Sequence, residues 1–270
     1  MYRQIIRFFL ICLAGLIVVS PFASHAEDNT ARITIISVYD NYQVNPRLDT
    51  AWGFACVIKM PAETLLFDTG GNPETLLSNM RKMDIPPESI DKVVISHIHG
   101  DHLGGLGGFL DRNPDVTVFI PQSLPDSTRD MISRKGAEFI DISSEREISA
   151  SVYTTGELYG PPEEQSLVID AQKGLIVITG CAHPGIVDIV KKAREFLKKN
   201  EVYLVMGGFH HPPVSVVKKF REIGVEKVAP SHCTGDRVRN AFASAYKEDF
   251  IEYGVGRTIT QSIFYKIVKP

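Results

Sequence analysis

Residues 96–102 read SHIHGDH and follow directly on residues 92–95, the segment KVVI. This stretch has three imidazoles and a carboxylate within six positions, and histidines packed this closely repel one another when they are protonated. When the histidines are buried and neutral, they need hydrogen-bond partners. A bound metal ion removes both difficulties, whereas a solvated His-rich loop would not need an apolar strand leading into it. The stretch therefore predicts a metal site at the end of a strand.

The spacing within this stretch predicts where its side chains point. Residues two apart on an extended chain face the same side, so His97 and His99 aim at one point. Asp101 and His102 are expected on the turn beyond the strand, pointing back from the other side. Imidazole suits zinc, iron, manganese or nickel, and the carboxylate also suits harder ions. One short peptide can therefore supply ligands to two adjacent metal positions.

The N-terminal segment 1–26 has the composition of a secretory signal. It carries basic Arg3 and Arg7, an apolar stretch at 8–19, and the small residues Ser24 and Ala26 at a cleavage site. The apolar stretch is shorter than the roughly 20 residues that a spanning helix needs. We expect cleavage, export to the periplasm, no stable membrane association afterwards, and one domain over residues 27–270.

Composition limits the partners of that domain. The 244 residues left from 270 after removal of 26 fit one large α/β domain or two small ones, and the absence of a Pro/Ser-rich linker favours one. The net charge of -3 offers no basic surface for nucleic acid, so a small-molecule substrate is expected. Cys56, Cys181 and Cys233 are an odd set, so at least one thiol is free or bound to metal. Cys56 lies in an apolar segment and is expected in the core.

Hydrophobic periodicity and turn residues predict alternating strands and helices. Expected strands are 32–38, 53–58, 64–67, 92–96, 116–120, 138–142, 147–154, 166–170, 175–179, 202–206, 227–229, and a final pair at 256–260 and 262–267. Expected helices are 73–83, capped by Asn72, and 103–110, 126–134, 184–198, 213–223 and 237–246. Each half has meandering strands followed by strand-helix units. This plan predicts two sheets packed face to face with helices outside.

The later histidines follow strand ends. His183, His210 and His232 each come just after an apolar strand and small residues. Ligands bind at such strand ends in α/β folds, and glycines let the backbone approach a crowded centre. A single histidine of this kind would more often be an ordinary polar residue, but the repetition favours function. We expect His183 and His232 as metal ligands, and His210 as a ligand or an acid/base group.

Asp68 stands at another strand end, in the sequence LLFDTG at 65–70. One interpretation is a turn built from Asp-Thr-Gly. The other is that its carboxylate accepts a hydrogen bond from a ligand histidine and fixes the tautomer of that ring. The sequence leaves both interpretations open.

In this order, DTG at 68–70, the cluster 96–102, GCAH at 180–183 and PSH at 230–232 resemble the metallo-β-lactamase superfamily. The resemblance spans nearly all of residues 27–270. It implies an α/β (α+β) protein with the four-layer αββα sandwich and a mono- or dinuclear centre. We expect two divalent ions there, zinc first, with manganese, iron or magnesium as alternatives. VYDN at 38–41, GGFH at 207–210 and HCTG at 232–235 are similar to the branch of dihydropterin-ribofuranosyl-aminobenzene-phosphate synthases. That branch has a transferase name in methanogens, and its exported relatives need not share the substrate.

The chain departs from the superfamily at one motif. The usual pattern has a further histidine before the strand that ends in a bridging Asp, yet no histidine lies between His102 and His183. The resemblance puts Cys181 near the position of that Asp, where lactamases have Cys, so Cys181 is a possible ligand. It leaves His183 or His210 to complete the site. The missing histidine and the flanking motifs argue against antibiotic hydrolysis.

The resulting hypothesis is a metal-dependent hydrolase or transferase. One ion would bind His97, His99 and His183, and a second would bind Asp101, His102 and His232. Activated water would attack an ester, thioester, phosphoester or lactone, with Asp101 essential and His210 serving the leaving group or the substrate. In a transferase the ions would polarise a pyrophosphate leaving group on a pterin-like substrate.

Two alternatives belong to other functional classes. A redox di-iron protein is disfavoured because such centres have Glu where His99 stands and carry a flavodoxin domain. A non-catalytic exported metal-binding protein would bind metal and turn over nothing. RNA processing is disfavoured by the charge, by the expected export and by the lack of a basic arm.

Overall fold

The computed structural model describes residues 30–264, so the expected signal at 1–26 lies outside the described residues. The strands are β1 (Thr30–Asp40), β2 (Phe54–Lys59), β3 (Thr64–Phe67), β4 (Lys92–Val94), β5 (Thr117–Pro121), β6 (Glu138–Ile142), β7 (Arg146–Ser149), β8 (Val152–Thr154), β9 (Leu167–Ala171), β10 (Gly174–Thr179), β11 (Val202–Gly208), β12 (Val225–Ser231) and β13 (Thr258–Phe264). The α-helices are α1 (Pro73–Lys82), α2 (Gly100–Leu103), α3 (Leu106–Leu110), α4 (Asp126–Arg134), α5 (Ile186–Leu197), α6 (Val216–Glu222) and α7 (Asp236–Tyr246).

The strands are hydrogen-bonded in the order β12-β11-β10-β9-β13-β1-β2-β3-β4-β5-β6, with β8 beside β9 and β7 beside β8. The first three strands pair antiparallel, as the sequence predicted, and β3 to β6 then run parallel. The second half ends in the parallel strands β10, β11 and β12. A single residue pair, Ile263 with Ala171, joins β13 to β9. Because this link is so short, the strands on its two sides can fold into two sheets that face each other.

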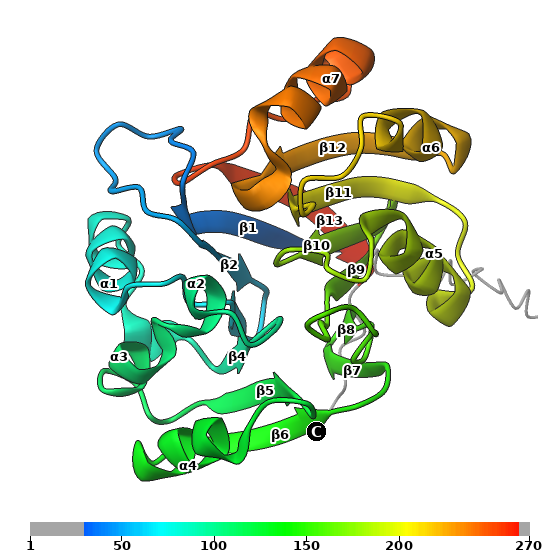
Figure 1. Ribbon diagram of the computed structural model, residues 1–270. Coiled ribbons are helices and arrows are strands. Elements are labelled where there is room, and N and C mark those ends of the chain that lie inside the picture. The colour runs from blue at the N-terminus through cyan, green and yellow to red at the C-terminus, as the bar shows by residue number, and fades with distance from the viewer. Residues whose placement is uncertain (1–29, 265–270) are drawn as a thin grey trace, which may run out of the picture.

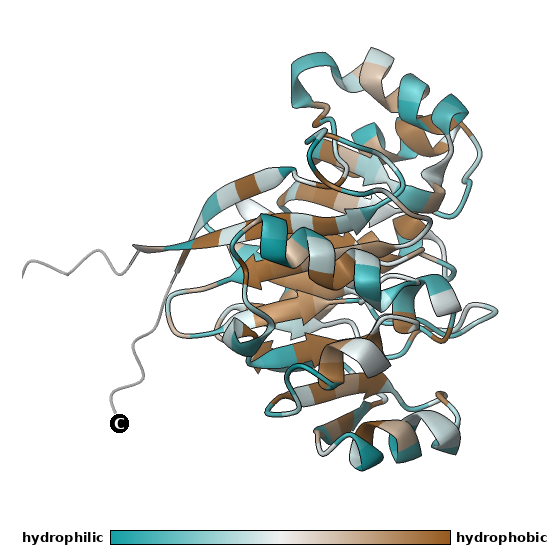
Figure 2. Cartoon of the chain, turned by 90° about the vertical axis from the view of Figure 1, so that its left-hand side faces the viewer, coloured by the Kyte–Doolittle hydropathy of each residue, from teal (hydrophilic) through white to brown (hydrophobic). Residues whose placement is uncertain are grey.

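Three apolar cores define the layers. The inner core contains residues of β1 to β5 together with residues of β8 to β13, Cys56 among them. A second core packs α1, α3 and α4 on the outer face of the first half, and a third packs α5, α6 and α7 on the second. Figure 1 shows these two groups of helices on opposite sides of the strands. Figure 2 shows hydrophobic residues concentrated along the strands and hydrophilic ones on the outer turns of the helices. The expected α/β class and four-layer αββα order are confirmed.

Local signals explain several element boundaries. α1 begins where predicted, with Pro73 in its first turn and the Asn72 side chain accepting a hydrogen bond from the Thr75 amide at 2.8 Å. α4 and β6 have the predicted bounds. The expected helix 103–110 was wrong, because it is two short helices. Glycines interrupt it where the backbone of another turn approaches: a Cβ on Gly105 would lie 2.1 Å from the Thr69 carbonyl oxygen.

Three other expectations also need correction. Segment 147–154 is the hairpin β7–β8, because Ser151 has a left-handed φ of 64° and turns the chain. The final strand pair is the single strand β13, since Gln261 continues the pairing with β1 opposite Ile33. Residues 265–267 lie outside the described residues. Asp101 and His102 lie on α2, which begins at Gly100, not on an irregular turn. Within residues 30–264, no helix has the length and apolar character needed to cross a membrane.

Candidate metal centre

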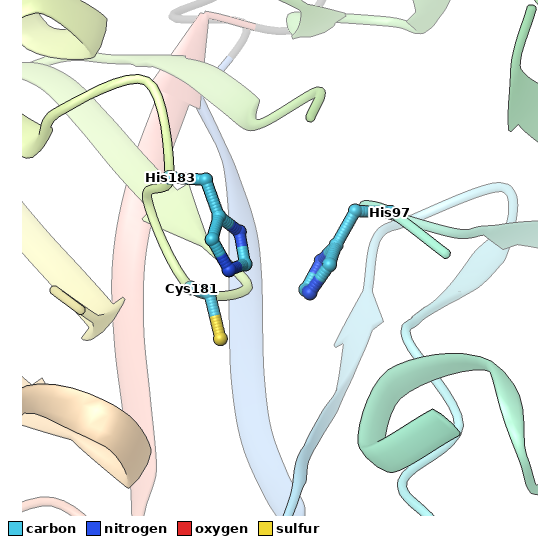
Figure 3. Close-up of side chains that lie close together, drawn as sticks. All are labelled: His97, Cys181 and His183. Carbon is cyan, nitrogen blue, oxygen red and sulfur yellow. The ribbon is translucent and has the colours of Figure 1, made fainter. Parts of the chain in front are cut away.

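The predicted side chains meet where strands of both halves end. His97 follows β4 of the first half, and Cys181, His210 and His232 follow β10, β11 and β12 of the second. Figure 3 shows the His97 ring facing Cys181 and His183 across a short gap between the two halves. The edge of the sheet that the sequence singled out thus gathers residues from two separate segments of the chain.

The first group contains His97, Cys181 and His183. Their ligand atoms lie within 4.8 Å of one another. The His99 ring lies 4.9 Å from both the His97 and the His183 ring, and its Nδ1 is 3.2 Å from Nε2 of His97. His97 is fully buried and His99 is exposed, so this group opens toward solvent on the His99 side.

The second group contains His102, Cys181 and His232, again with ligand atoms within 4.8 Å. Nε2 of His102 is 3.2 Å from Nε2 of His232 and 3.2 Å from Sγ of Cys181. Oδ2 of Asp101 lies 3.3 Å from Nε2 of His232 and 3.7 Å from Nε2 of His102. Cys181 belongs to both groups, so the two candidate positions are adjacent.

The far nitrogens of the second group fix the tautomers of its rings. Nδ1 of His102 lies 2.7 Å from Oδ2 of Asp68, and Nδ1 of His232 lies 3.0 Å from Oδ1 of Asn41. Both partners are acceptors, so the network assigns the proton of each ring to Nδ1. The two Nε2 atoms then face each other at 3.2 Å as two acceptors without a proton between them. A cation bound between them would satisfy both lone pairs.

In the first group too, the hydrogen bonds place the ring protons on Nδ1. The Ser96 hydroxyl donates to Oδ2 of Asp68 at 2.8 Å, so it accepts from Nδ1 of His97 at 2.7 Å. Nδ1 of His183 donates to Oε2 of Glu164 at 2.8 Å. Nε2 of His183 is buried and has no hydrogen-bond partner among residues 30–264. Imidazole lone pairs, a thiol and a carboxylate converge here, and this donor set fits a zinc-type ion.

Protonation of the buried His97 and His102 rings does not supply this positive charge. Burial, reinforced by neighbouring imidazoles, lowers the pKa of His97 and of His102 to about 3, so both rings are neutral at pH 7. Partial burial would raise the pKa of Asp101, but the imidazoles of His232 and His102 beside it outweigh burial and hold that pKa well below its usual range. The site is therefore ready to bind positive charge at neutral pH.

Asp68, which follows β3, connects that strand end to the histidine cluster at 96–102. Its carboxylate accepts from the Ser96 amide at 2.7 Å, from the Ser96 hydroxyl, and from His102. Burial raises its pKa to about 7, yet three donors surround it, the pattern of an ionised carboxylate. Gly180 packs on this pair, since a Cβ there would lie 2.2 Å from the Ser96 oxygen. Asp68 thus occupies the position that an acceptor for a ligand histidine would take.

Glu164 is a site residue that sequence reasoning missed. It is fully buried and accepts hydrogen bonds from the amides of Cys181, Ala182 and His183 at 2.8–2.9 Å, besides the one from Nδ1 of His183. Burial alone would raise its pKa, but these donors and His97 bring the pKa down to about 2. Its only signal in the sequence is an acidic pair before an apolar strand, which is common in loops. Asn41, the partner of His232, was also missed as a contact.

His210 and His211 lie at the rim. The His210 ring is exposed and lies 4.3 Å from the His183 ring. One of its ring nitrogens lies within 4.8 Å of the sulfurs of Cys181 and Cys233. Burial on one side and the nearby His183 lower its pKa, which favours the neutral ring. His211 lines a cavity of about 490 Å³ with Thr234 and Arg237.

Exposed apolar side chains border the opening. Trp52 is 55% exposed, and its ring lies 4.9 Å from the His232 ring. Ile98, within the histidine cluster, is 41% exposed. Exposed large apolar groups beside buried polar ligands are typical of a small-molecule site.

Comparisons with known proteins agree with this geometry. The family model described as "Metallo-beta-lactamase superfamily" matches residues 53–217, more than half of the chain. The 7,8-dihydropterin-6-methyl-4-(beta-D-ribofuranosyl)-aminobenzene-5'-phosphate synthase of Methanocaldococcus jannaschii is 29% identical over 286 aligned positions, covering 86% of this chain and 97% of that protein.

Two solved structures extend the comparison. Tm1679, described as a metal-dependent hydrolase of the beta-lactamase superfamily, is 26% identical, with a TM-score of 0.69 over 84% of this chain and 98% of that one. The metallo-beta-lactamase fold protein YhfI from Bacillus subtilis is 14% identical, with a TM-score of 0.62 over 86% of this chain and 99% of that one. The second likeness concerns the fold alone.

Proposed function

The chain belongs to the metallo-beta-lactamase superfamily, and we propose that it is a metal-dependent hydrolase with two ions held by the groups that share Cys181. The first position would use His97, His99 and His183, the second would use Asp101, His102 and His232, and the Cys181 sulfur would be a ligand common to both. The observation that carries this proposal is the pair of facing Nε2 acceptors of His102 and His232. The unpartnered Nε2 of His183 supports the first position.

Divalent ions in these positions, zinc first, would supply the Lewis acidity that polarises a phosphoryl or acyl group and activates water. The protein residues provide the rest. Asp68, Asn41 and Glu164 hold three rings with Nε2 unprotonated and aimed inward. The neutral ring of His210 stands beside His183 at the rim, where it can hydrogen-bond a substrate oxygen and orient it.

The rim favours a small phosphoester that carries a planar group. The exposed Trp52 ring next to His232 provides a stacking surface for such a group. Arg237, in the cavity beside the site, offers a positive charge to an anionic group. Thioesters and lactones have no anionic group at the reacting centre for Arg237 to bind, so they are the weaker candidate substrates.

Transfer is a second candidate, favoured by one observation. The M. jannaschii synthase aligns with 86% of the chain, far beyond the metal motifs. In that case the same ions would polarise a pyrophosphate leaving group on a pterin-like substrate, and an aromatic acceptor would replace water.

Elemental analysis combined with a substrate screen tests the proposal. The expected result is two bound ions and hydrolysis of phosphodiester or phosphomonoester probes, lost with a chelator and restored by zinc. Label from ¹⁸O-water should enter the product of hydrolysis and should be absent from the product of transfer. A metal-replete protein that turns over none of the phosphoester, thioester, lactone and pterin diphosphate probes would contradict enzyme function and favour a metal-binding protein. A visible iron chromophore with electron-transfer activity would favour the redox alternative.

We further propose that the protein is exported. The composition of residues 1–26 supports this, and these residues lie outside the described part of the chain. N-terminal sequencing of the protein recovered from the periplasm should give Glu27 as the first residue. A cytoplasmic protein that begins at Met1 would contradict export but leave the metal site untouched.

A further inference from the structure

Cys181 and Cys233 form a pair of thiols at the metal centre. Their sulfurs lie 3.3 Å apart, and no disulfide joins them. The two cysteines follow β10 and β12, which are not neighbours, because β11 runs between them. The sulfurs can meet because Gly208, at the end of β11, has no side chain. A Cβ on Gly208 would lie 2.8 Å from Sγ of Cys233.

The surroundings of the pair hold the two sulfurs close together and aim one at the other. Each cysteine is 4% exposed, so a small reagent reaches the pair more easily than a large one. Sγ of Cys233 accepts a hydrogen bond from the His210 amide at 3.3 Å, and its thiol points toward Sγ of Cys181. A disulfide needs a sulfur separation of about 2.05 Å, so the sulfurs must approach by about 1.2 Å. Cys56 packs in the inner core and is fully buried.

We propose that this pair is an oxidation site for hydrogen peroxide, and that its disulfide form removes the ligand common to both metal positions. The inference rests on the proposed function, because Cys181 is the shared ligand. Peroxide is about the size of water, so it is the kind of small reagent that can reach thiols that are 4% exposed. A bound ion protects Cys181, so oxidation belongs to the metal-free protein.

The chemistry balances with peroxide as the only oxidant. Sγ of Cys233 attacks peroxide, the O–O bond breaks, and a sulfenic acid and one water form. The Cys181 thiol then attacks that sulfur, the S–S bond forms, and the hydroxyl leaves as a second water. Two thiols and one peroxide give one disulfide and two waters. A dithiol reductant reverses the bond and returns Cys181 to the metal site.

The experiment uses the full chain with Cys12→Ser and Cys56→Ala, so that only the pair carries thiols. Metal-free and zinc-loaded protein are treated with hydrogen peroxide, and intact mass, peptide maps and zinc affinity are measured. We expect the metal-free protein to lose two hydrogens through a Cys181–Cys233 link. Its zinc affinity should fall about 10-fold or more, the scale on which losing a supporting group acts. The dithiol should restore it, and zinc loaded beforehand should slow oxidation.

Cys233→Ser is the matched control. It keeps Cys181 but lacks both the sulfur that attacks peroxide and the partner for a disulfide, so peroxide should leave its mass and its zinc affinity unchanged. Oxygen added to both cysteines of the parent without a link would overturn the proposal, as would a disulfide that leaves zinc affinity unchanged. Link formation is measured in metal-free protein without substrate, so its outcome is independent of whether the protein hydrolyses any ester.

Discussion

The rings of His102 and His232 are fixed by their outer nitrogens, which leaves their inner nitrogens facing each other 3.2 Å apart. Asp68 and Asn41 supply the outer contacts from segments far from either histidine. At the scale of single residues, the candidate metal site is therefore a set of oriented lone pairs. The orientation comes from residues that do not themselves reach the ion.

Asp101→Ala tests the carboxylate of the second group. The variant should lose metal from that group and about 100-fold or more in kcat/KM, because Oδ2 lies beside Nε2 of both histidines of the pair. Elemental analysis and initial rates measure both effects. Asp126→Ala, at an exposed residue of α4, should match the parent protein. An active Asp101→Ala variant with a full complement of metal would exclude the proposed role.

Glu164→Gln tests the buried acceptor. A glutamine has one acceptor oxygen, so one pair of donors in the 181–183 loop would face an NH₂ group. We expect metal affinity to fall about 10–100-fold and the free energy of unfolding to fall by about 1–3 kcal/mol. Glu163→Gln, at the neighbouring position, is the control for both titration and denaturation. Unchanged metal affinity in Glu164→Gln would mean that Glu164 does not orient His183.

The pH dependence of stability follows from the buried rings. In metal-free protein, His97 and His102 have pKa values of about 3, below the ordinary 6.5. Between pH 6.5 and pH 3 the unfolded chain therefore binds more protons at these two rings than the native state does. The free energy of unfolding should fall as the pH drops from 6.5 toward 3, and Glu164 should add to the loss between about 4.5 and 2.

Asp68 acts in the opposite direction. Its raised pKa of about 7 contributes stability below pH 3.8 that is lost as the pH rises through 7. Denaturant titrations from pH 7 to pH 4 should show the net loss on acidification, and His102→Ala should reduce the slope. Stability that rises on acidification in this range would contradict neutral buried rings.

At the scale of elements, glycines let loops from different strands meet. Gly180→Ala puts a Cβ against Ser96 and Asp68, so we expect a loss of about 1–3 kcal/mol in stability together with weaker metal binding. Gly100→Ala is the matched control, because nothing lies within 4 Å of its Cβ although it stands in the histidine cluster. Thermal denaturation and metal titration compare the two. Equal stability of both variants would contradict the close approach at Gly180.

Elements with strong local signals were predictable, and elements set by distant partners were not. The Asn72 cap and Pro73 fix the start of α1 through contacts within one turn. β13 was taken for two strands because its single straight course depends on pairing with β1, more than 200 residues earlier in the chain. In the site, the histidines were found from their spacing. Glu164 was not, since its function depends on a loop that follows the next strand hairpin.

At the scale of the whole molecule, each half provides part of the centre. His97, His99, Asp101 and His102 come from the first half, and Cys181, His183 and His232 come from the second. Bound ions would therefore join the halves. The family and the αββα order were recognisable from the motifs and the strand pattern, and both are confirmed. The substrate could not be predicted, because the rim residue Trp52 has no motif around it.

Metal removal should lower stability across the whole molecule. Ligands that bind only the native state add about 2.7 kcal/mol at 100 times Kd, and these ions would contact both halves. The unfolding midpoint should drop on chelation and recover with zinc in one cooperative transition. A midpoint indifferent to chelator in a protein that had bound zinc would contradict ions that join the halves.

Cobalt titration tests the shared-thiolate centre most directly. The account predicts two bound equivalents, with a thiolate-to-cobalt charge-transfer band that grows with both, and Cys181→Ser should lose this band while Cys56→Ala keeps it. Two bound ions without a thiolate band, or a band that survives in Cys181→Ser, would contradict the claim that Cys181 joins the two positions.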